Sequence, residues 1–143
     1  MIGILIATHA DFGQGVINAV KLITGTHENV KTIGLNHGDG ITVFEEKVFY
    51  YLEEMDQGDG VIGLCDFLGG SPSNAMLRCM KMKNFPCIVG VNMPMVLEAV
   101  MNRGNTDVWE LAEKCRTAGI SGIVSLNAVA QKMMVEEESS ADF

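Results

Sequence analysis

Two short stretches of the 143-residue sequence place polar side chains where they could carry chemistry. His9 ends an apolar run in "ILIATHADFGQG", and Asp66 ends another in "GVIGLCDFLGG". An aspartate that accepts the proton of one imidazole nitrogen fixes the tautomer and leaves the other nitrogen free as a nucleophile. If the fold brings the two residues together, we expect His9 to be the nucleophile and Asp66 to orient it.

The residues after Asp66 predict a site for an anion. Gly69, Gly70 and Ser71 open a helical pattern, with Pro72 expected at its first position and Ser71 as a candidate cap. Unpaired backbone N–H groups at a helix start bind anions, and glycines let the backbone approach closely. A nucleophilic histidine, an orienting carboxylate and an anion site together predict phosphoryl transfer through a phosphohistidine. The sequence has no Walker lysine or kinase glycine loop, so we expect neither bound ATP nor any cofactor or metal.

The two other histidines fit this chemistry less well. His27, in "TGTHENV", falls in a connecting loop at the opposite end of the sheet and is expected to be a solvated loop residue. His37, in "LNHGDG", is the alternative nucleophile, because it follows the second apolar run at the same sheet edge as His9. It has an acidic neighbour, Asp39, but no anion-binding helix start.

A methionine pair lies after the fourth apolar run, in "GVNMPMVLE". Met93, Pro94 and Met95 have two open interpretations. They are core residues at a helix start, or they form an adaptable apolar surface beside the site where a partner protein docks.

The elements that must position these residues follow a βα rhythm. The apolar runs "IGILIA", "VKTIGL", "GVIGLC" and "CIVGV" alternate with helical patterns at 12–24, 41–55, from about 71, from about 93 and at 107–118. Continuous Val/Ile/Leu runs are typical of strands that are buried on both faces. We therefore predict an α/β fold, a doubly wound and mostly parallel sheet in the order 2-1-3-4 with helices on both faces. This fold puts the carboxyl ends of the first and third strands together at the working edge.

Composition predicts one domain and excludes several classes of function. We expect a domain over residues 1–134, with a short fifth strand in "GIVSL", and an acidic, disordered tail over 135–143. A net charge of −8 without a basic cluster argues against nucleic-acid binding. No apolar stretch reaches the ~18 residues of a membrane span, so the sequence indicates a cytoplasmic protein. Four cysteines without ligand spacing are expected to be core residues in a reducing compartment: Cys65, Cys79, Cys87 and Cys115.

Three of these stretches resemble a known family. "IATHADFGQG", "LCDFLGGSPSNAM" and "GVNMPMVLEAVM" are similar, in order and spacing, to the enzyme IIA component of the mannose family of the bacterial phosphoenolpyruvate-dependent sugar phosphotransferase system. The resemblance covers roughly residues 1 to 130. It implies that His9 accepts a phosphoryl group from phospho-HPr on Nε2 and passes it to a histidine of enzyme IIB. It also implies that Asp66 binds Nδ1 and that Ser71 holds phosphate oxygens.

The resemblance further implies a cytoplasmic homodimer, linked to the membrane only through a IIC/IID transporter. In this family the last strand, here "GIVSL", can be antiparallel and exchanged between subunits. Some members continue into a fused IIB domain, whereas this sequence ends after its acidic tail, so we expect IIB to be a separate chain. Since IIA does not contact sugar, the sequence leaves mannose, fructose, sorbose and amino sugars open.

Three alternatives remain at the level of sequence. The phosphocarrier subunit of a dihydroxyacetone kinase shares the histidine chemistry, but the double glycine before Ser71 and Pro72 favours the sugar system. A response-regulator receiver, phosphorylated on Asp66 with Mg²⁺, needs an acidic pair where Thr8 and His9 stand. A flavodoxin-like binding module needs a phosphate loop rich in Ser and Thr, which the first loop lacks.

Overall fold

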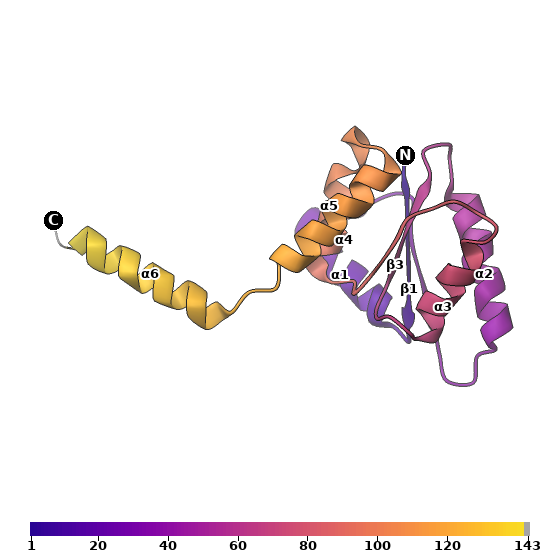
Figure 1. The fold of residues 1–143 in the computed structure, drawn as a ribbon, viewed down its shortest axis with the longest axis horizontal. Coiled ribbons are helices and arrows are strands. Elements are labelled where there is room, and N and C mark those ends of the chain that lie inside the picture. Colours follow the sequence, from indigo (N-terminus) through magenta and orange to yellow (C-terminus); the bar gives the residue numbers. More distant parts are fainter. Residues whose placement is uncertain (142–143) are drawn as a thin grey trace.

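The computed structural model describes residues 1–141, and a four-stranded parallel sheet lies at its centre (Figure 1). The strand order is β2-β1-β3-β4, which confirms the predicted order. The elements in chain order are β1 (Gly3–His9), α1 (Phe12–Thr24), β2 (Val30–Leu35), α2 (Ile41–Met55), β3 (Val61–Cys65), α3 (Ser71–Cys79), β4 (Cys87–Val89), α4 (Met93–Asn102), the 3₁₀ turn η1 (Arg103–Asn105), α5 (Val108–Ser121) and α6 (Leu126–Ala141).

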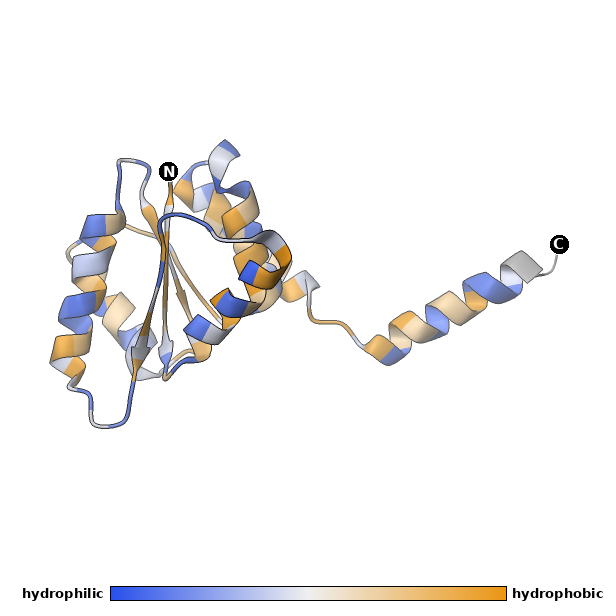
Figure 2. Cartoon of the chain, turned by 180° about the vertical axis from the view of Figure 1, so that it is seen from behind, coloured by the Kyte–Doolittle hydropathy of each residue, from blue (hydrophilic) through white to orange (hydrophobic). Residues whose placement is uncertain are grey.

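Helices cover both faces of the sheet, as the continuous apolar strands require. One core cluster joins β1 and β3 to α1, α4 and α5, and includes Ile4, Ile6 and Val96. The other joins the opposite faces of the same strands to α2 and α3, and includes Leu5, Leu52 and Met76. Figures 1 and 2 show these two helical layers on either side of the strands. The alternation of Ile4, Leu5 and Ile6 between the clusters is the period of two of a strand that is buried on both faces.

Strand register places the site at one edge of the sheet. Ala7 of β1 lies opposite Cys65, the last residue of β3. The next residue of β3 in the chain, Asp66, therefore comes level with Thr8 and His9. Because both strands run parallel, residues 57 positions apart in sequence meet beyond their carboxyl ends.

The turn after β1 depends on a close backbone approach. Ala10 adopts a left-handed conformation with φ of 47° and donates its N–H to the carbonyl of Leu35 at 2.8 Å. A Cβ atom on Gly34 would lie only 2.1 Å from the Ala10 carbonyl oxygen. Only glycine fits at this position of β2, because any side chain would push the turn that carries His9 away from the sheet.

The C-terminal region differs from the prediction in two ways. The expected fifth strand in "GIVSL" is not formed: residues 123–125 lie outside any helix or strand, and Leu126 already begins α6. The segment leaves the domain after α5, so no strand among residues 1–141 lies beside it to pair with its backbone. The tail, expected to be disordered from residue 135, instead continues α6 to Ala141. Residues 142 and 143 lie outside the described residues.

Two physical features explain the helical tail. After Gly122 the chain contains neither glycine nor proline, and Ala, Gln, Lys, Met and Glu, all strong helix formers, dominate residues 128–138. The acidic composition suggested disorder, but three glutamates in a row do not disfavour a helix that has begun upstream. Within residues 1–141, no helix is long and apolar enough to cross a membrane.

Candidate functional site

His9 and Asp66 meet at the carboxyl edge of the sheet, as the sequence predicts. Asp66 Oδ2 lies 2.7 Å from His9 Nδ1 and also accepts the backbone N–H of His9 at 2.9 Å. The His9 side chain is 43% exposed, whereas that of Asp66 is 14% exposed. The imidazole is thus held through Nδ1 by a mostly buried carboxylate, while the ring stays open to solvent.

Asp66 is held as a carboxylate by its hydrogen bonds. Burial alone would raise the pKa of Asp66, but the backbone N–H and the ring of His9 and the N–H of Phe67 outweigh it, so the pKa lies below its ordinary value. The Phe67 N–H donates to Oδ1 at 3.1 Å, which leaves Oδ2 for His9. An ionised carboxylate only accepts hydrogen bonds, so His9 Nδ1 carries the proton and Nε2 holds the free lone pair.

Two neighbours fix the plane of the imidazole ring. Phe67 stacks on His9 with ring centroids 5.1 Å apart and an interplanar angle of 22°. On another side the ring lies against Gly70, where a Cβ atom would come within 2.6 Å of His9 Cε1 and 3.2 Å of Nε2. The absence of a side chain at Gly70 therefore lets the helix start lie directly beside His9 Nε2.

The start of α3 offers donors next to Nε2. Gly70 is the N-cap residue and Ser71 the first helical residue, one position earlier than expected, with Pro72 behind it. Ser71 does not cap the helix. Within residues 1–141 neither its hydroxyl nor the N–H groups of Gly70 and Ser71 have a hydrogen-bond partner. These donors and the positive end of the helix dipole can hold phosphoryl oxygens.

Ser73 holds this loop in place, a role that the sequence analysis missed. Its hydroxyl, which is buried, accepts the Gly69 N–H at 3.2 Å and donates to the Gly70 carbonyl at 3.0 Å. Gly69 has a φ of 90°, which only glycine adopts without strain. The contact is a variant of the capping box, in which the third helical residue binds the backbone before the helix. A serine at the third helical position is the feature of the sequence that could have predicted this role.

Thr8 is a second buried polar residue beside His9. Its Oγ1 accepts the N–H of Gly13 at 2.9 Å and donates to the His9 carbonyl at 3.2 Å. The hydroxyl thereby joins the end of β1 to the first turn of α1. It fixes the backbone from which His9 projects.

The other two histidines lie apart from this arrangement. His27 lies in the α1–β2 loop, where its Nε2 is 2.8 Å from Thr24 Oγ1, so it is partly anchored rather than fully solvated. His37 is exposed, and its expected acidic neighbour Asp39 accepts the N–H of Asn36 instead. Within residues 1–141 no carboxylate orients the His37 ring.

The methionine pair after β4 is mainly structural. Met95 is 3% exposed and belongs to the first core cluster, which favours the core interpretation of this residue over the docking one. The helical period turns Met95, Val96 and Ala99 toward the sheet. Met93 is partly buried against the same cluster, and Pro94 packs where a side chain on Gly122 would lie.

Exposed apolar side chains occur in the segments that adjoin His9 and Asp66 in the chain. Phe12 is 50% exposed, Phe67 56% and Leu68 75%, and all three belong to the loops and helix start that surround His9 and Asp66. Sequence reasoning missed them because a loop phenylalanine has no periodic pattern to mark it. Within residues 1–141, no group of three or more His, Cys, Asp or Glu side chains is placed to hold a metal ion.

Comparison with known proteins identifies relatives of this chain. Residues 3–116 match the EIIA-man family model, described as the PTS system fructose IIA component. The chain is 33% identical over 129 residues to the PTS system mannose-specific EIIAB component of Escherichia coli K12, covering 89% of this chain but only 40% of that protein. It is 29% identical to the PTS system fructose-specific EIIA component of Bacillus subtilis, over 78% of this chain and 77% of the relative.

A solved structure with a similar fold also comes from a phosphotransferase system component. Phosphotransferase system component EIIA from Streptococcus agalactiae superposes with a TM-score of 0.83 at 27% identity, covering 90% of this chain and 99% of that one. These matches give no support to the dihydroxyacetone kinase alternative. With the family model spanning most of the chain, the protein belongs to the EIIA-man family of IIA components of the sugar phosphotransferase system.

Proposed function

We propose that this chain is a phosphocarrier that accepts a phosphoryl group on His9 Nε2 from phospho-HPr and transfers it to a histidine of enzyme IIB. One observation carries the proposal: Asp66 holds Nδ1 at 2.7 Å, while Nε2 faces Gly70 at the start of α3. An oriented nucleophile beside unpaired N–H donors is the arrangement that phosphoryl transfer through a phosphohistidine needs.

The transfer step follows from these positions. The Nε2 lone pair attacks phosphorus, a nitrogen–phosphorus bond forms, and the bond from phosphorus to the donor breaks with its electron pair leaving on the donor. The His9 ring gains positive charge, which Asp66 stabilises from the Nδ1 side. The N–H groups of Gly70 and Ser71 and the Ser71 hydroxyl bind the phosphoryl oxygens. Transfer to IIB repeats the step with His9 as the leaving group.

The surface around His9 supports contact with other proteins. Phe12, Phe67 and Leu68 are large and exposed, and we assign them the docking role that was one of the two interpretations of Met93, Pro94 and Met95. A partner that covers these side chains would also exclude water from the transferring group. The names of the relatives differ in sugar, mannose for one and fructose for another, so the proposal leaves the sugar open.

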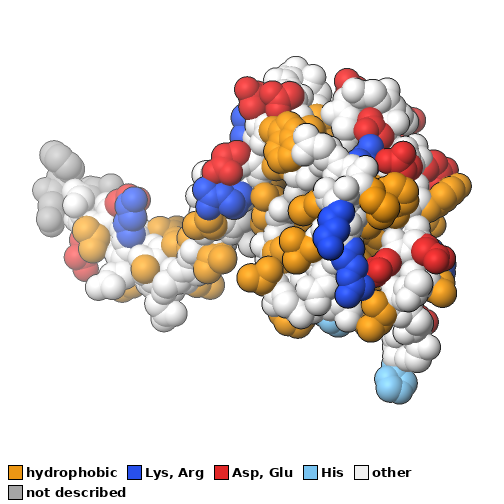
Figure 3. All heavy atoms as spheres, turned by 45° about the vertical axis from the view of Figure 1, so that its right-hand side comes forward, with side chains coloured by type: hydrophobic (Ala, Val, Ile, Leu, Met, Phe, Trp, Pro, Cys, Tyr) orange, Lys and Arg blue, Asp and Glu red, His pale blue; other side chains and the backbone are white. Residues whose placement is uncertain are grey.

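We also propose that the chain works as a homodimer. Every side chain of residues 121–139 is exposed, including those of Ile123, Val124 and Leu126. Figure 3 shows hydrophobic side chains along this projecting segment. A 16-residue helix is marginal in water without a partner, so a second copy that covers α6 would account for its sequence.

The phosphocarrier proposal is tested by labelling. The chain is incubated with phosphoenolpyruvate, enzyme I and HPr, and its gain of a phosphoryl group is followed by mass. We expect a group that acid removes and base does not, as for a phosphorus–nitrogen bond, and no gain in His9→Gln.

A control variant and the chemical stability of the label separate this outcome from the alternatives. His37→Gln changes the other candidate histidine and should label like the unsubstituted protein. Labelling that persists in His9→Gln, or that requires Mg²⁺ and Asp66 and is lost in base, would reject His9 as the acceptor and favour an aspartyl phosphate.

A further inference from the structure

A second pocket lies away from His9, between α1 and the edge strand β2. It measures about 240 Å³ and its floor is apolar. Ile17, Val20 and Val100 are at most 8% exposed, and Val30 is partly buried beside them. None of the residues assigned to phosphoryl transfer lines it.

The strand pattern explains why the space exists. In β2, Val30 and Thr32 face α1, whereas Lys31 and Ile33 face the opposite layer, where Lys31 lies over the Tyr51 ring. Valine and threonine are short, and β2 is an edge strand with no further helix beside it. The two short side chains therefore leave an opening beneath the outer flank of α1.

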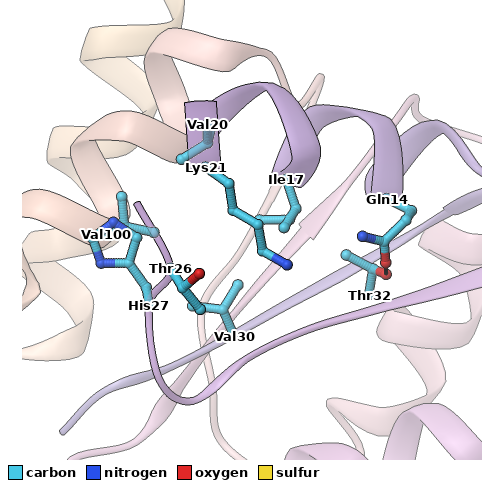
Figure 4. A pocket seen from close by; sticks show the side chains of 9 residues that line it. All are labelled: Gln14, Ile17, Val20, Lys21, Thr26, His27, Val30, Thr32 and Val100. Atoms are coloured by element: carbon cyan, nitrogen blue, oxygen red, sulfur yellow. Dashed lines mark hydrogen bonds between the residues drawn. The ribbon is translucent and has the colours of Figure 1, made fainter. Parts of the chain in front are cut away.

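Polar groups line the mouth of the pocket, and some have no partner. Figure 4 shows the Lys21 chain descending from α1, with its amino nitrogen between Thr26 on one side and the Gln14–Thr32 pair on the other. Gln14 Oε1 accepts the Thr32 hydroxyl at 2.9 Å, so that pair is satisfied. Within residues 1–141 the ion pairs involve other cations, and neither Lys21 Nζ nor Thr26 Oγ1 has a hydrogen-bond partner.

His27 closes one end of the pocket in a defined tautomer. The Thr24 hydroxyl donates its proton to the Val20 carbonyl at 3.1 Å, so it must accept from His27 Nε2 at 2.8 Å. Neutral His27 then carries its proton on Nε2 and leaves Nδ1 as an acceptor. The His27 ring therefore forms a fixed side of the pocket. The charged group available to a ligand in the pocket is the ammonium of Lys21.

We propose that this pocket binds a small carboxylate with a short aliphatic body. The carboxylate would lie between Lys21 Nζ and Thr26 Oγ1, and the aliphatic chain would lie on the floor formed by Ile17, Val30 and Val100. A charge-assisted bond to an ammonium is stronger than a neutral hydrogen bond, and the apolar floor gains free energy from covering hydrocarbon.

Size and charge exclude other ligand classes. The pocket is smaller than the ~300–1,000 Å³ of sites for drug-sized ligands, so a nucleotide does not fit. One lysine on an apolar floor does not match a phosphate dianion, which is bound by several donors. An uncharged aliphatic molecule would gain no charge-assisted bond from Lys21.

Titration by NMR tests the proposal with the full chain. The probe is 4-methylpentanoate, its uncharged counterpart is 4-methylpentanamide, and acetate is the carboxylate without an aliphatic body. We expect saturable shifts of the amides of residues 20–32 with a dissociation constant of about 1 mM or tighter for 4-methylpentanoate. The amide and acetate should each bind at least about tenfold more weakly, a difference of about 1.4 kcal/mol.

Matched variants assign the charge to Lys21. Lys21→Met should weaken 4-methylpentanoate binding at least about tenfold, and Lys47→Met, an equal change of charge on the exposed side of α2, should not change it. Lys21 is exposed, so its removal leaves the core intact, and an unchanged Tm verifies this. Equal binding of acid and amide, unaltered affinity in Lys21→Met, or no saturable shift at these amides would each overturn the proposal. Phosphorylation of His9 is not needed for any of these measurements.

Discussion

Asp66 is the residue on which the proposed chemistry of His9 depends most. Replacement by Asn keeps the shape but presents an amide to Nδ1, which no longer requires Nδ1 to carry the proton. The corresponding change in the Ser-His-Asp triad costs about 10⁴-fold in rate, so we expect Asp66→Asn to slow phosphoryl transfer to this chain by at least about 100-fold. Rapid-quench measurement of transfer from phospho-HPr checks this, with Asp39→Asn as the exposed control.

The same substitution has a signature in stability. Because the folded-state pKa of Asp66 lies below its ordinary value of 3.8, the ionised carboxylate stabilises the fold at neutral pH. That contribution is complete above the unfolded-state pKa and is lost as the pH falls through the folded-state value. The difference in unfolding free energy between the protein and Asp66→Asn should therefore shrink from pH 7 to below pH 3.8. A difference that grows toward acid would contradict the bonding described for Asp66.

Substitution of the two glycines before α3 distinguishes two effects. A side chain at Gly70 would contact the His9 ring, whereas a side chain at Gly69 would strain the backbone. Gly70 has φ of −83°, which alanine accepts, but its Cβ would press on His9 Cε1. Gly69 has φ of 90°, with open space around it. We expect Gly70→Ala to slow phosphoryl transfer with little loss of stability, and Gly69→Ala to cost about 1–2 kcal/mol of stability while the ring stays in place.

Transfer rates and urea unfolding of the two variants distinguish these effects. If Gly70→Ala transfers as fast as the unsubstituted protein, the close contact between the helix start and His9 does not matter for the reaction.

Sequence reasoning found the site residues that a strand end or a helix start marks. His9 and Asp66 each end an apolar run, and the fold rule joins such ends. Phe67 and Ser73 were missed because their roles depend on loop geometry: one side chain stacks on the ring, and the other binds the backbone three and four residues earlier. Met95 was left undecided because its burial depends on how α4 is rotated against the sheet.

At the scale of elements, buried strands and amphipathic helices were predictable and the peripheral segment was not. The strand at 61–65 is apolar throughout, and the strand at 3–9 is apolar up to Ala7, before Thr8 and His9. The segment "GIVSL" has the composition of a strand, but a strand needs a neighbour, and this chain places none beside it. Pairing is a property of the surroundings, so composition alone could not decide it.

Arg103 joins the amino ends of two strands from the 3₁₀ turn η1. Its guanidinium, 8% exposed, donates to the carbonyls of Ile2 at 3.0 Å and Glu28 at 2.6 Å, and burial lowers its pKa. We expect Arg103→Met to destabilise the fold by about 3 kcal/mol, because two bonds from a charged donor are lost and buried carbonyls remain unpaired.

Chemical denaturation measures this loss against a surface arginine. Arg116 is exposed and pairs with Glu113 one turn away, so Arg116→Met should change stability little. Similar losses in the two variants would show that the Arg103 contacts do not hold the strand ends together.

At the scale of the whole molecule, the chain consists, over residues 1–141, of a sheet that is packed between helices and a C-terminal helix that packs against no other element. The sheet buries its apolar faces against five helices, whereas α6 projects away from them (Figure 1). The side chains of α6 through residue 139 are exposed. The acidic tail thus continues a helix that has exposed Val129, Met133 and Met134. A sequence pattern of mixed apolar and acidic residues does not reveal whether another molecule covers it.

If a second copy covers α6, the apolar stripe through Val129 and Met133 should lie in the interface. These residues are one turn apart, and Asn127 and Gln131 form a matching pair on another side of the helix. Val129→Lys with Met133→Lys should therefore convert a dimer into a monomer, because two buried ammonium groups cost more than the contact gains. Asn127→Lys with Gln131→Lys adds the same charge and should leave a dimer. Sedimentation equilibrium over a range of concentrations measures both. A monomeric unsubstituted protein, or equal association of both double variants, would remove the second copy as the partner of α6.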